Sequence, residues 1–478
     1  MQQPYNREPT PLRRIGDRTF RLSRPKPVRI HLEPLHQIKA AGASFSLVVF
    51  GFAAVIAIGA ILLILPISAK SGGLTNPLTA LFTATSSVCV TGLVLVDTGT
   101  YWSGFGQAVI LVLIQLGGLG FMTSATLFLL AIRGRISLRE KILAGQALGL
   151  ENYGGLTGLV KRVVIFSLVI EAAGAGLLFL AFRQYGSTDT AIWRSVFHAV
   201  SAFNNAGFDI LGNFSSLIDY RTNAGIVVTL AFLIILGGIS FIVIEDIIRK
   251  RRFSHLQTDT KIVLITTFGL LLLGFGYYFF AEYSNPATMG GMPFSDKLLV
   301  SFFQSLTPRT AGFTTVDIGR MGEASIFFTM LLMFIGGAAG STAGGVKVNT
   351  AGLLIFSALS ALQGKEKPGA FGRSFVPAQI YRAMALIIIY IALVSIVALA
   401  LWVTEGFNFT RILFETFSAF GTVGLSTGIT PALTTAGRVI IILAMFVGRL
   451  GPLALASILV ERQKKASFSY PEAFIRIG

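Results

Sequence analysis

The sequence predicts an all-α membrane protein with eight transmembrane helices and four re-entrant pore helices, in four pseudo-repeated helix, pore helix, helix units around one central pore. Three observations support this fold class. Of the 478 residues, 53% are hydrophobic and only 13% are charged, which is outside the usual range of soluble domains. Eight apolar segments are long enough to cross about 30 Å of hydrocarbon. Four of the connections between them contain segments that resemble one another.

The eight apolar segments follow one another from residue 44 to residue 460. They cover residues 44–66, 107–131, 163–181, 223–244, 262–281, 324–358, 384–403 and 439–460. We expect each to span the membrane as a helix, with the sixth interrupted by glycines. An even number of spans places both termini on one side.

Lysine and arginine are unevenly divided between the two sides. Twenty-eight of the 39 lie in residues 1–43, 133–162, 249–261, 365–382 and 462–476. Only eight lie in the alternate connections, residues 67–106, 183–222, 284–323 and 404–434. Because cytoplasmic loops are enriched in positive charge, we expect both termini in the cytoplasm of a cell that carries this protein in its plasma membrane. The net charge of +17 is then a property of topology, and no nucleic-acid partner is expected.

These assignments predict the domain organisation. Residues 1–43 form a basic cytoplasmic arm of unassigned role, too long for the charged region of a signal peptide, so no cleaved leader is expected. The single cysteine, Cys89, excludes an intrachain disulfide and any two-cysteine metal or redox site. The repeats cover residues 44–132, 162–248, 261–359 and 377–461, followed by a cytoplasmic tail, residues 462–478.

The outward connections contain a repeated pattern. Each has an apolar stretch too short to span the membrane, which predicts a re-entrant segment. In every copy a phenylalanine precedes a glycine by ten positions, and Leu or Phe follows the glycine. The copies are Phe82 to Gly92, Phe197 to Gly207, Phe302 to Gly312 and Phe414 to Gly424. Their glycines lie 115, 105 and 112 residues apart, which indicates an internal fourfold repeat.

A cation filter explains this pattern physically. Irregular backbone at membrane depth is tolerated where it lines an aqueous cavity, and inward carbonyls can replace the water shell of a cation. Glycine permits positive φ and leaves the lumen open. Short helices expected at 78–88, 190–203, 296–306 and 409–420 would point their partly negative C-terminal ends at the ion. The alternative for any single glycine is close helix packing. The predicted filter residues are Val90, Thr91, Gly92, Asn205, Ala206, Gly207, Thr310, Ala311, Gly312, Thr422, Val423 and Gly424.

The four motifs resemble those of the Trk, Ktr and HKT potassium transporters. They are Thr-Ala-Thr-Ser-Ser-Val-Cys-Val-Thr-Gly-Leu, Ala-Phe-Asn-Asn-Ala-Gly-Phe, Thr-Pro-Arg-Thr-Ala-Gly-Phe and Ser-Ala-Phe-Gly-Thr-Val-Gly-Leu. The resemblance runs from about Ser44 to the C-terminus. It implies one filter glycine per unit and, with glycine in all four, a preference for potassium, since serine in the first repeat accompanies sodium selectivity in plant members. Only a polar arm precedes the first repeat, so the chain is most similar to the Ktr-type membrane subunit.

A glycine-rich stretch, Phe334 to Thr350, interrupts the sixth apolar segment. A phosphate cradle is one interpretation, but Val346 separates Gly345 from Lys347 and no strand precedes the run. Close helix packing through small residues is a second. The third, which the family resemblance favours, is a mobile intramembrane gating loop beneath the filter.

Arg449 lies within the last apolar segment, where an unpaired charge would cost several kcal/mol, so we expect it to face the protein interior. It is either a structural arginine satisfied by carbonyls or, as the resemblance implies, a positive plug that acts with the glycine-rich loop. The predicted gate residues are Gly336, Gly337, Gly340, Ser341, Thr342, Gly344, Gly345, Lys347 and Arg449.

The remaining polar candidates carry weaker signals. Glu171 lies in mid-helix and is expected to pair structurally with a neighbouring cation. Three aspartates follow filter glycines and either concentrate cations or form local hydrogen bonds. The histidines lack metal-ligand spacing, and the first is expected to support its pore helix. These residues are Asp97, Asp209 and Asp317, and His198 and His255.

The predicted function is potassium uptake across the plasma membrane through a carbonyl filter, with a cytoplasmic regulatory subunit controlling the gate. A sodium-permeable or weakly selective transporter of the same architecture is the alternative, and a secondary transporter of another solute is a remote one. Catalysis is not expected, because the spanning segments offer only Glu171 and Arg449 as clear mid-membrane charges. No covalent cofactor is expected; K⁺ occupies the pore, and Na⁺ as a co-ion is left open. The resemblance implies a homodimer on a ring of nucleotide-binding regulatory subunits, and the basic loops fit either that ring or membrane lipid.

Overall fold

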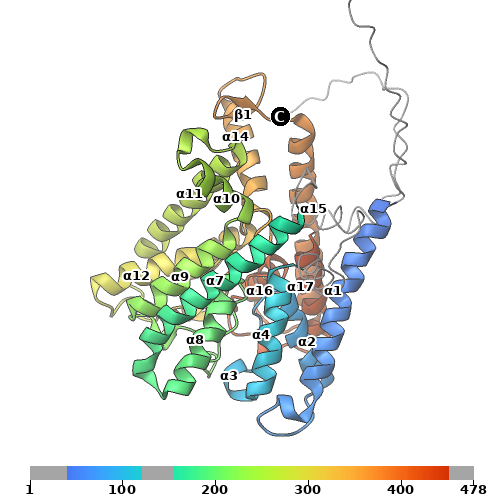
Figure 1. The fold of residues 1–478 in the computed structure, drawn as a ribbon, viewed down its shortest axis with the longest axis vertical. Helices are drawn as coiled ribbons and strands as arrows, with labels where there is room; N and C mark the ends of the chain where they lie inside the picture. Colours follow the sequence, from blue (N-terminus) through green and yellow to red (C-terminus); the bar gives the residue numbers. More distant parts are fainter. Residues whose placement is uncertain (1–39, 121–155, 452–478) are drawn as a thin grey trace, which may run out of the picture. The chain divides into compact units, whose positions relative to one another are not determined.

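The computed structural model describes residues 40–120 and 156–451 (Figure 1). Internal contacts divide the chain into Met1–Ala41 and Gly42–Gly478, and nearly all described residues belong to the second part. The described residues of that part are mostly helical. Its α-helices are α1 (Ala40–Ile64), α2 (Pro77–Val88), α3 (Thr98–Tyr101), α4 (Gly104–Gly118), α7 (Leu156–Phe182), α8 (Thr188–Phe203), α9 (Ala224–Gly238), α10 (Phe241–Lys250), α11 (Thr258–Ala281), α12 (Phe294–Leu306), α13 (Glu323–Phe334), α14 (Val348–Leu362), α15 (Pro377–Thr404), α16 (Phe409–Gly421) and α17 (Thr435–Leu450).

Short 3₁₀ turns and one hairpin complete the described secondary structure. The hairpin pairs β1 (Gly369–Ala370) with β2 (Arg373–Ser374) in antiparallel register. Phe371 and Gly372 between them both have positive φ, 53° and 74°, as a tight two-residue hairpin turn requires. The 3₁₀ turns are Pro66–Ser68, Arg183–Tyr185, Ile218–Tyr220, Phe253–His255, Ile318–Arg320 and Thr430–Ala432.

Among the residues that the structure describes, three helices are long and apolar enough to cross a membrane, α7, α11 and α15, and the bent pair α9 and α10 makes a fourth if it is one span. In α15 only 22% of the most apolar window is buried within the molecule, and Ile388 and Ile396 are among its exposed side chains. A helix that is apolar on its outer surface is stable in lipid and costly in water. The long helices therefore identify a membrane protein.

The segment 223–244, predicted to be one continuous helix, is divided in the structure, and that prediction is wrong. Helix α9 ends at Gly238, and α10 leaves it at an angle of 95°. The Ser240 hydroxyl accepts a hydrogen bond from the N–H of Ile242, which caps the new helix. The break follows the pair Gly237 and Gly238, the weakest helix formers available apart from proline. The sixth apolar segment is also divided, as expected, between α13 and α14.

Four short helices, α2, α8, α12 and α16, lie within two residues of the predicted short helices. Three of them pack against a helix of the preceding repeat, and α2 of the first repeat packs against α17 of the fourth. Helix α4 contacts α8, α9 contacts α12, α13 contacts α16, and α17 contacts α2. The order of these contacts is cyclic, so the four short helices surround a common centre.

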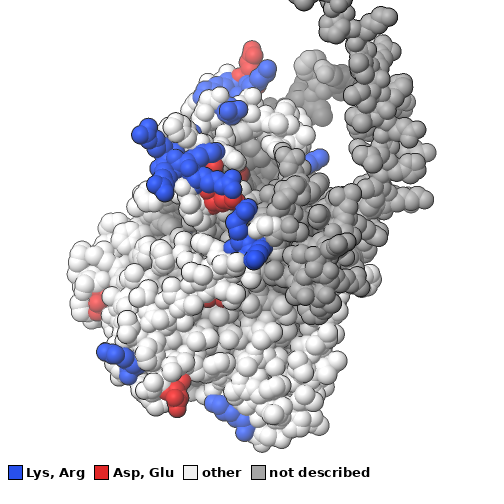
Figure 2. Space-filling model, in the orientation of Figure 1, with Lys and Arg blue, Asp and Glu red and all other residues white. Residues whose placement is uncertain are grey.

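The end points of two further predicted spans, beyond residues 120 and 451, lie outside the described residues, as do most of the N-terminal arm and the C-terminal tail. Charge is segregated in the part that the structure describes. Figure 2 shows Lys and Arg gathered around α10 and the β1–β2 hairpin on the face in view, with few elsewhere. Helix α10 ends in the run from Arg249 to Arg252, where Lys250 forms an ion pair with Asp246 at 2.7 Å.

Candidate functional site

The four predicted filter glycines lie side by side at the centre of the cyclic arrangement. A β-carbon built on Gly92 would lie 3.1 Å from Cα of Gly207, and one on Gly207 would lie 2.7 Å from Cα of Gly312. From Gly312 the corresponding distance to Cα of Gly424 is 3.4 Å, and from Gly424 back to Gly92 it is 3.1 Å. Contacts below about 3.4 Å leave no room for a side chain, so only glycine fits this closed ring.

The four glycine segments, residues 90–92, 205–207, 310–312 and 422–424, share one backbone conformation. The φ angles of the glycines are 91°, 69°, 78° and 92° in chain order. Two positions earlier, φ is 56° at Val90, 55° at Asn205, 69° at Thr310 and 49° at Thr422. A left-handed conformation costs a residue with a side chain roughly 1–2 kcal/mol. Four such residues at one frame persist only where the surroundings hold the backbone.

Hydrogen bonds to the preceding short helix hold each segment. The residue before each glycine donates its N–H to a carbonyl near the end of that helix. The N···O distances are 2.8 Å from Thr91 to Ser86, 2.8 Å from Ala206 to Ser201, 3.0 Å from Ala311 to Thr307 and 2.8 Å from Val423 to Ser418. All four bonds close a turn of five or six residues, so each helix fixes its own segment.

A hydroxyl at the end of each short helix adds a second brace, which sequence reasoning missed. The Ser86 hydroxyl accepts from the N–H of Gly92, and that of Ser418 accepts from the N–H of Gly424, both at 3.1 Å. Serine six positions before the glycine recurs in three of the four motifs, and this signal could have identified the brace.

The other two segments use a hydroxyl as donor. Ser201 donates to the carbonyl oxygen of Phe208 at 2.7 Å, and Thr307 donates to that of Phe313. The brace therefore holds the residue after the glycine in these two units and the glycine itself in the other two.

Several buried oxygens of the glycine segments have no hydrogen-bond partner among the described residues. They are the hydroxyls of Thr91, Thr310 and Thr422 and the side-chain oxygen of Asn205. Buried polar atoms are normally satisfied, and exceptions mark sites of function or of bound water and ions. Oxygen atoms are the ligands that hard cations prefer. The chemistry of these segments thus fits a hard cation as cargo.

A cavity of 510 Å³ opens beside the ring and is lined by all four glycines. Asp97, Asp209 and Asp317 line the same cavity. Each also makes a local bond: Asp97 accepts from the N–H of Thr100 at 2.6 Å, Asp209 from that of Leu211 at 3.2 Å, and Asp317 from that of Gly319 at 2.9 Å. These bonds agree with the local hydrogen-bonding role weighed for the three aspartates, and the role in concentrating cations stays a prediction.

All predicted gate residues except Arg449, which lies on α17, are in loop 335–347 between α13 and α14. Thr342 makes the most hydrogen bonds within this loop. Its hydroxyl donates to the carbonyl of Gly237 at 2.9 Å and accepts from the side-chain amide of Asn205 at 3.0 Å. Its carbonyl accepts from Arg449 at 2.7 Å, while the other guanidinium nitrogen of Arg449 donates to Gly117. Arg449 therefore joins the loop to α4 through backbone carbonyls.

Glycines bring the rest of the loop against the glycine segments. A β-carbon on Gly344 would collide with the hydroxyl of Thr422, and one on Gly336 would lie 3.2 Å from the methyl group of Thr310. Lys347 donates to the carbonyl of Ala343 at 2.5 Å. The remaining predicted gate residues also lie in the loop: Gly337 accepts from Val348, Ser341 donates to Ala338, and Gly340 and Gly345 have φ of 76° and 67°.

Glu171 does not pair with a cation among the described residues, and that expectation is wrong. Its carboxylate accepts from the side-chain amide of Asn204 at 3.0 Å, and the same amide nitrogen donates to Gln115 at 2.9 Å. The neutral amide of Asn204, at the C-terminal end of α8, satisfies the carboxylate because α7 packs directly against α8. The contact places a carboxylate next to Asn205, the first residue of the second glycine segment.

Sequence reasoning missed Glu415, which is buried and binds the loop after the fourth glycine. It accepts from the hydroxyl of Ser426 at 2.6 Å, the N–H of Thr427 at 2.9 Å and the hydroxyl of Thr430 at 2.8 Å. Glu415 lies nine residues before the glycine of its repeat, and His198 occupies the same position in the second repeat. Nδ1 of His198 lies 2.7 Å from the carbonyl oxygen of Arg194.

A histidine at this frame bonded within its own helix agrees with the expected supporting role. His255 lies in a 3₁₀ turn. Within residues 40–120 and 156–451 no group of His, Cys, Asp and Glu could hold a metal ion.

Comparisons with known proteins cover nearly the whole chain. The family model TrkH, described as cation transport protein, matches residues 31–469. The chain is 44% identical over 434 residues to the Ktr system potassium uptake protein B of Bacillus subtilis, covering 90% of this chain and 95% of that protein. It is 40% identical over 459 residues to the potassium/sodium uptake protein NtpJ of Enterococcus hirae, covering 95% and 99%.

Among solved structures, the potassium transporter TrkH from Vibrio parahaemolyticus matches with a TM-score of 0.71. The match covers 89% of this chain and 86% of that one at 19% identity. At that identity the similarity concerns the fold alone.

Proposed function

Since the chain belongs to the TrkH family of membrane cation transport proteins, we propose that it takes up potassium ions through a single pore lined by the four glycine segments. The closed ring of four glycines with one shared backbone conformation carries this proposal. Backbone carbonyls of these segments take the place of the ion's hydration shell. The C-terminal ends of α2, α8, α12 and α16 contribute partial negative charge to the same centre.

Selectivity depends on how firmly the structure fixes the diameter of the glycine ring and the orientation of its carbonyl groups. The helix-end hydroxyls and N–H bonds restrain each segment, so contraction around a smaller ion must break hydrogen bonds. Glycine in all four frames supports preference for potassium. The names of two relatives differ on this point, one specifying potassium and the other potassium/sodium. Sodium permeation or sodium as a co-ion is therefore the competing proposal for the same architecture.

Loop 335–347 and Arg449 form the proposed gate. The loop touches three of the four glycine segments through Thr310, Thr422 and Asn205, so it lies directly beside the pathway. Arg449 adds a positive charge at the loop, which opposes the passage of a cation. Opening requires the loop to leave Asn205 and Arg449, and both contacts are single hydrogen bonds to Thr342.

The remaining architecture is proposed on the same basis. Eight spans in four units place both termini in the cytoplasm, with the basic surface around α10 and the β1–β2 hairpin on the inner side of the plasma membrane. The subunit acts as a homodimer under a ring of nucleotide-binding regulatory subunits. The word "system" in the names of the Ktr relatives supports a partner subunit.

Ion uptake into cells that lack their own potassium systems tests the proposal. We expect the full chain to restore uptake of K⁺ and Rb⁺ with little Na⁺ uptake, and Gly92→Ser to raise the Na⁺ share. If the chain restored the uptake of another solute but not of K⁺, the potassium transport proposal would be overturned. Equal Na⁺ and K⁺ uptake in the wild type would favour the weakly selective alternative, and an unaltered ion preference in Gly92→Ser would remove the filter assignment.

A further inference from the structure

Glu171 is a buried carboxylate outside the glycine ring and outside loop 335–347. It lies on α7, one of the long apolar helices, and only 5% of its surface is exposed. It accepts a hydrogen bond at 3.0 Å from the side-chain amide of Asn204, which is fully buried and directly follows α8. A carboxylate within a membrane-spanning helix is costly and marks a candidate functional residue. The contacts of this pair indicate what the carboxylate does.

The carboxylate orients the side-chain amide of Asn204. An ionised carboxylate only accepts hydrogen bonds, so it faces the amide nitrogen and turns the amide oxygen away. The same nitrogen donates to the side-chain oxygen of Gln115 on α4 at 2.9 Å. The amide oxygen lies against α4 itself, where a β-carbon on Gly118 would collide with it, and it has no hydrogen-bond partner among the described residues. One orientation of Asn204 therefore fits both Glu171 and the end of α4.

The end of α4 also anchors the proposed gate. The carbonyl of Gly117, two residues after Gln115, accepts from one guanidinium nitrogen of Arg449. The other guanidinium nitrogen donates to the carbonyl of Thr342 at 2.7 Å. A continuous series of contacts thus runs from Glu171 to the loop, by way of one amide, the last turn of α4 and one guanidinium group.

We propose that Glu171 is a positioning residue of the gate, which acts through Asn204 on the end of α4. The carbonyl of Gly117 at that end keeps Arg449 within reach of the loop, so the closed position of loop 335–347 depends on the carboxylate. A charge-assisted hydrogen bond is stronger than a neutral one, and its loss lets the amide turn and frees the end of α4. The population then shifts toward the released loop. This inference rests on the proposed function, since it takes the loop to be the gate.

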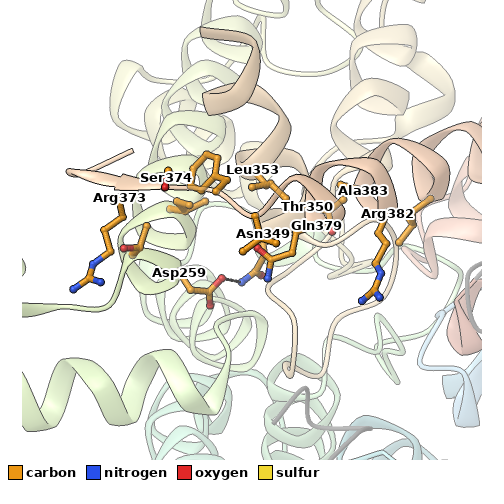
Figure 3. Close-up of a pocket in the computed structure, with 14 residues that line it drawn as sticks. Asp259, Asn349, Thr350, Leu353, Arg373, Ser374, Gln379, Arg382 and Ala383 are labelled. Atoms are coloured by element: carbon orange, nitrogen blue, oxygen red, sulfur yellow. Dashed lines mark hydrogen bonds between the residues drawn. The ribbon is translucent and has the colours of Figure 1, made fainter. Parts of the chain in front are cut away.

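A separate anchor holds the loop through α14. The side-chain oxygen of Asn349 accepts from the N–H of Ala339 at 2.8 Å, and its amide nitrogen donates to Asp259 at 2.6 Å. Figure 3 shows the second of these bonds in the wall of a cavity of 470 Å³ that is lined by α11, α14 and α15. These bonds involve different residues from those that join Glu171 to Arg449, so the two anchors should act independently.

Rubidium flux into liposomes that contain the purified full chain tests the proposal. Glu171→Gln keeps the shape of the side chain and removes its charge. We expect flux to rise about threefold, which is part of the roughly tenfold that a lost hydrogen bond to a charged group allows. Asn204→Asp places two carboxylates in contact and should raise flux likewise. The exchanged pair Glu171→Gln, Asn204→Asp restores a donor opposite an acceptor and should return flux toward the wild-type value.

Glu282→Gln is the matched control. Glu282 is also a buried carboxylate, but it binds Asn285 and Thr288 in the connection from α11 to α12. Its substitution should not raise flux. A general loss of stability lowers flux, so a rise in Glu171→Gln that the control lacks separates positioning of the gate from structural support.

Double variants test the route from Glu171 to the loop. Added to Arg449→Ala, Glu171→Gln should leave flux at the level of Arg449→Ala, because the contact through which Glu171 acts is already lost. Added to Asn349→Ala, it should multiply the two single increases, since that anchor is separate.

Unchanged or reduced flux in Glu171→Gln at equal protein content, or no return of flux in the exchanged pair, would overturn the proposal. A further rise above the level of Arg449→Ala would contradict the route through α4. Flux that rises in Arg449→Ala but not in Glu171→Gln would count against Glu171 alone, whereas absence of rubidium flux in both the wild type and Arg449→Ala would count against the proposed function.

Discussion

The glycine segments and loop 335–347 are both irregular, glycine-containing backbone, but they are held in different ways. Each glycine segment bonds to the end of its own short helix, as Thr91 does to Ser86. The loop is held by distant residues, since Arg449 reaches Thr342 across 107 positions and Asn205 across 137. Local bonds form wherever the helix forms, whereas long-range side-chain bonds can be lost one at a time. The glycine ring is therefore rigid, whereas loop 335–347 beside it can move when its long-range hydrogen bonds break.

Substitution within the ring should have the largest effect. In Gly207→Ala the new β-carbon meets Cα of Gly312 at 2.7 Å, and the positive φ of 69° adds about 1–2 kcal/mol of strain. We expect rubidium uptake to fall by more than about tenfold, since 1.4 kcal/mol alone corresponds to tenfold. Gly276→Ala on α11, where no atom lies within 4 Å, is the control and should transport normally. Normal uptake by Gly207→Ala at equal membrane abundance would show that the ring is not rigid.

Release of the loop should have the next largest effect, in the opposite direction. Arg449→Ala removes hydrogen bonds to Thr342 and Gly117, so we expect rubidium uptake to rise several-fold, and deletion of residues 340–345 to act likewise. Arg438→Ala is the control on the same helix, because Arg438 binds carbonyls of Leu433 and Pro431 instead. Unchanged uptake in both the Arg449 variant and the deletion would remove the gating proposal.

Removal of one brace from the ring should have a smaller effect, visible in selectivity. Ser86→Ala removes the acceptor for the N–H of Gly92, a bond worth about 0.5–1.5 kcal/mol. We expect the ratio of K⁺ to Na⁺ uptake to fall by about two- to tenfold, following that energy. The neighbouring Ser87→Ala is the matched control, because its hydroxyl donates to Thr83 within the helix. An equal change in both serine variants would assign the effect to helix stability.

The outer carboxylates should contribute least. Asp209→Asn removes a charge at the cavity and keeps an oxygen for the N–H of Leu211. We expect apparent K⁺ affinity to weaken by about twofold at low ionic strength and to match the wild type in 0.5 M salt, where the Debye length is below about 5 Å. Asp189→Asn on α8, which does not line the cavity, should match the wild type throughout. A loss that persists at high salt would indicate a structural role for Asp209.

Local features were the most predictable from the sequence. The short helices begin and end within two residues of their predicted bounds, because Asn76 and Asn408 cap two of them and glycine-containing turns end them. The resemblance to Ktr-type membrane subunits is confirmed by the family match and by relatives of 44% and 38% identity. The break between α9 and α10 was missed, since Gly237 and Gly238 are tolerated within an apolar helix and composition alone does not choose between bend and continuity.

The sequence by itself determined that the protein lies in a membrane, where the four short helices lie, and where each filter glycine follows its helix. These features depend on composition and on neighbours within ten residues. Only the tertiary structure decided which residues lie beside these glycines and beside the loop. It placed Gly424 against Gly92 to close the ring, gave Thr342 its contacts with Asn205 and Arg449, and paired Glu171 with an amide. Such contacts join residues from 33 to 332 positions apart. They depend on how whole helices pack, and no local pattern in the sequence records that packing.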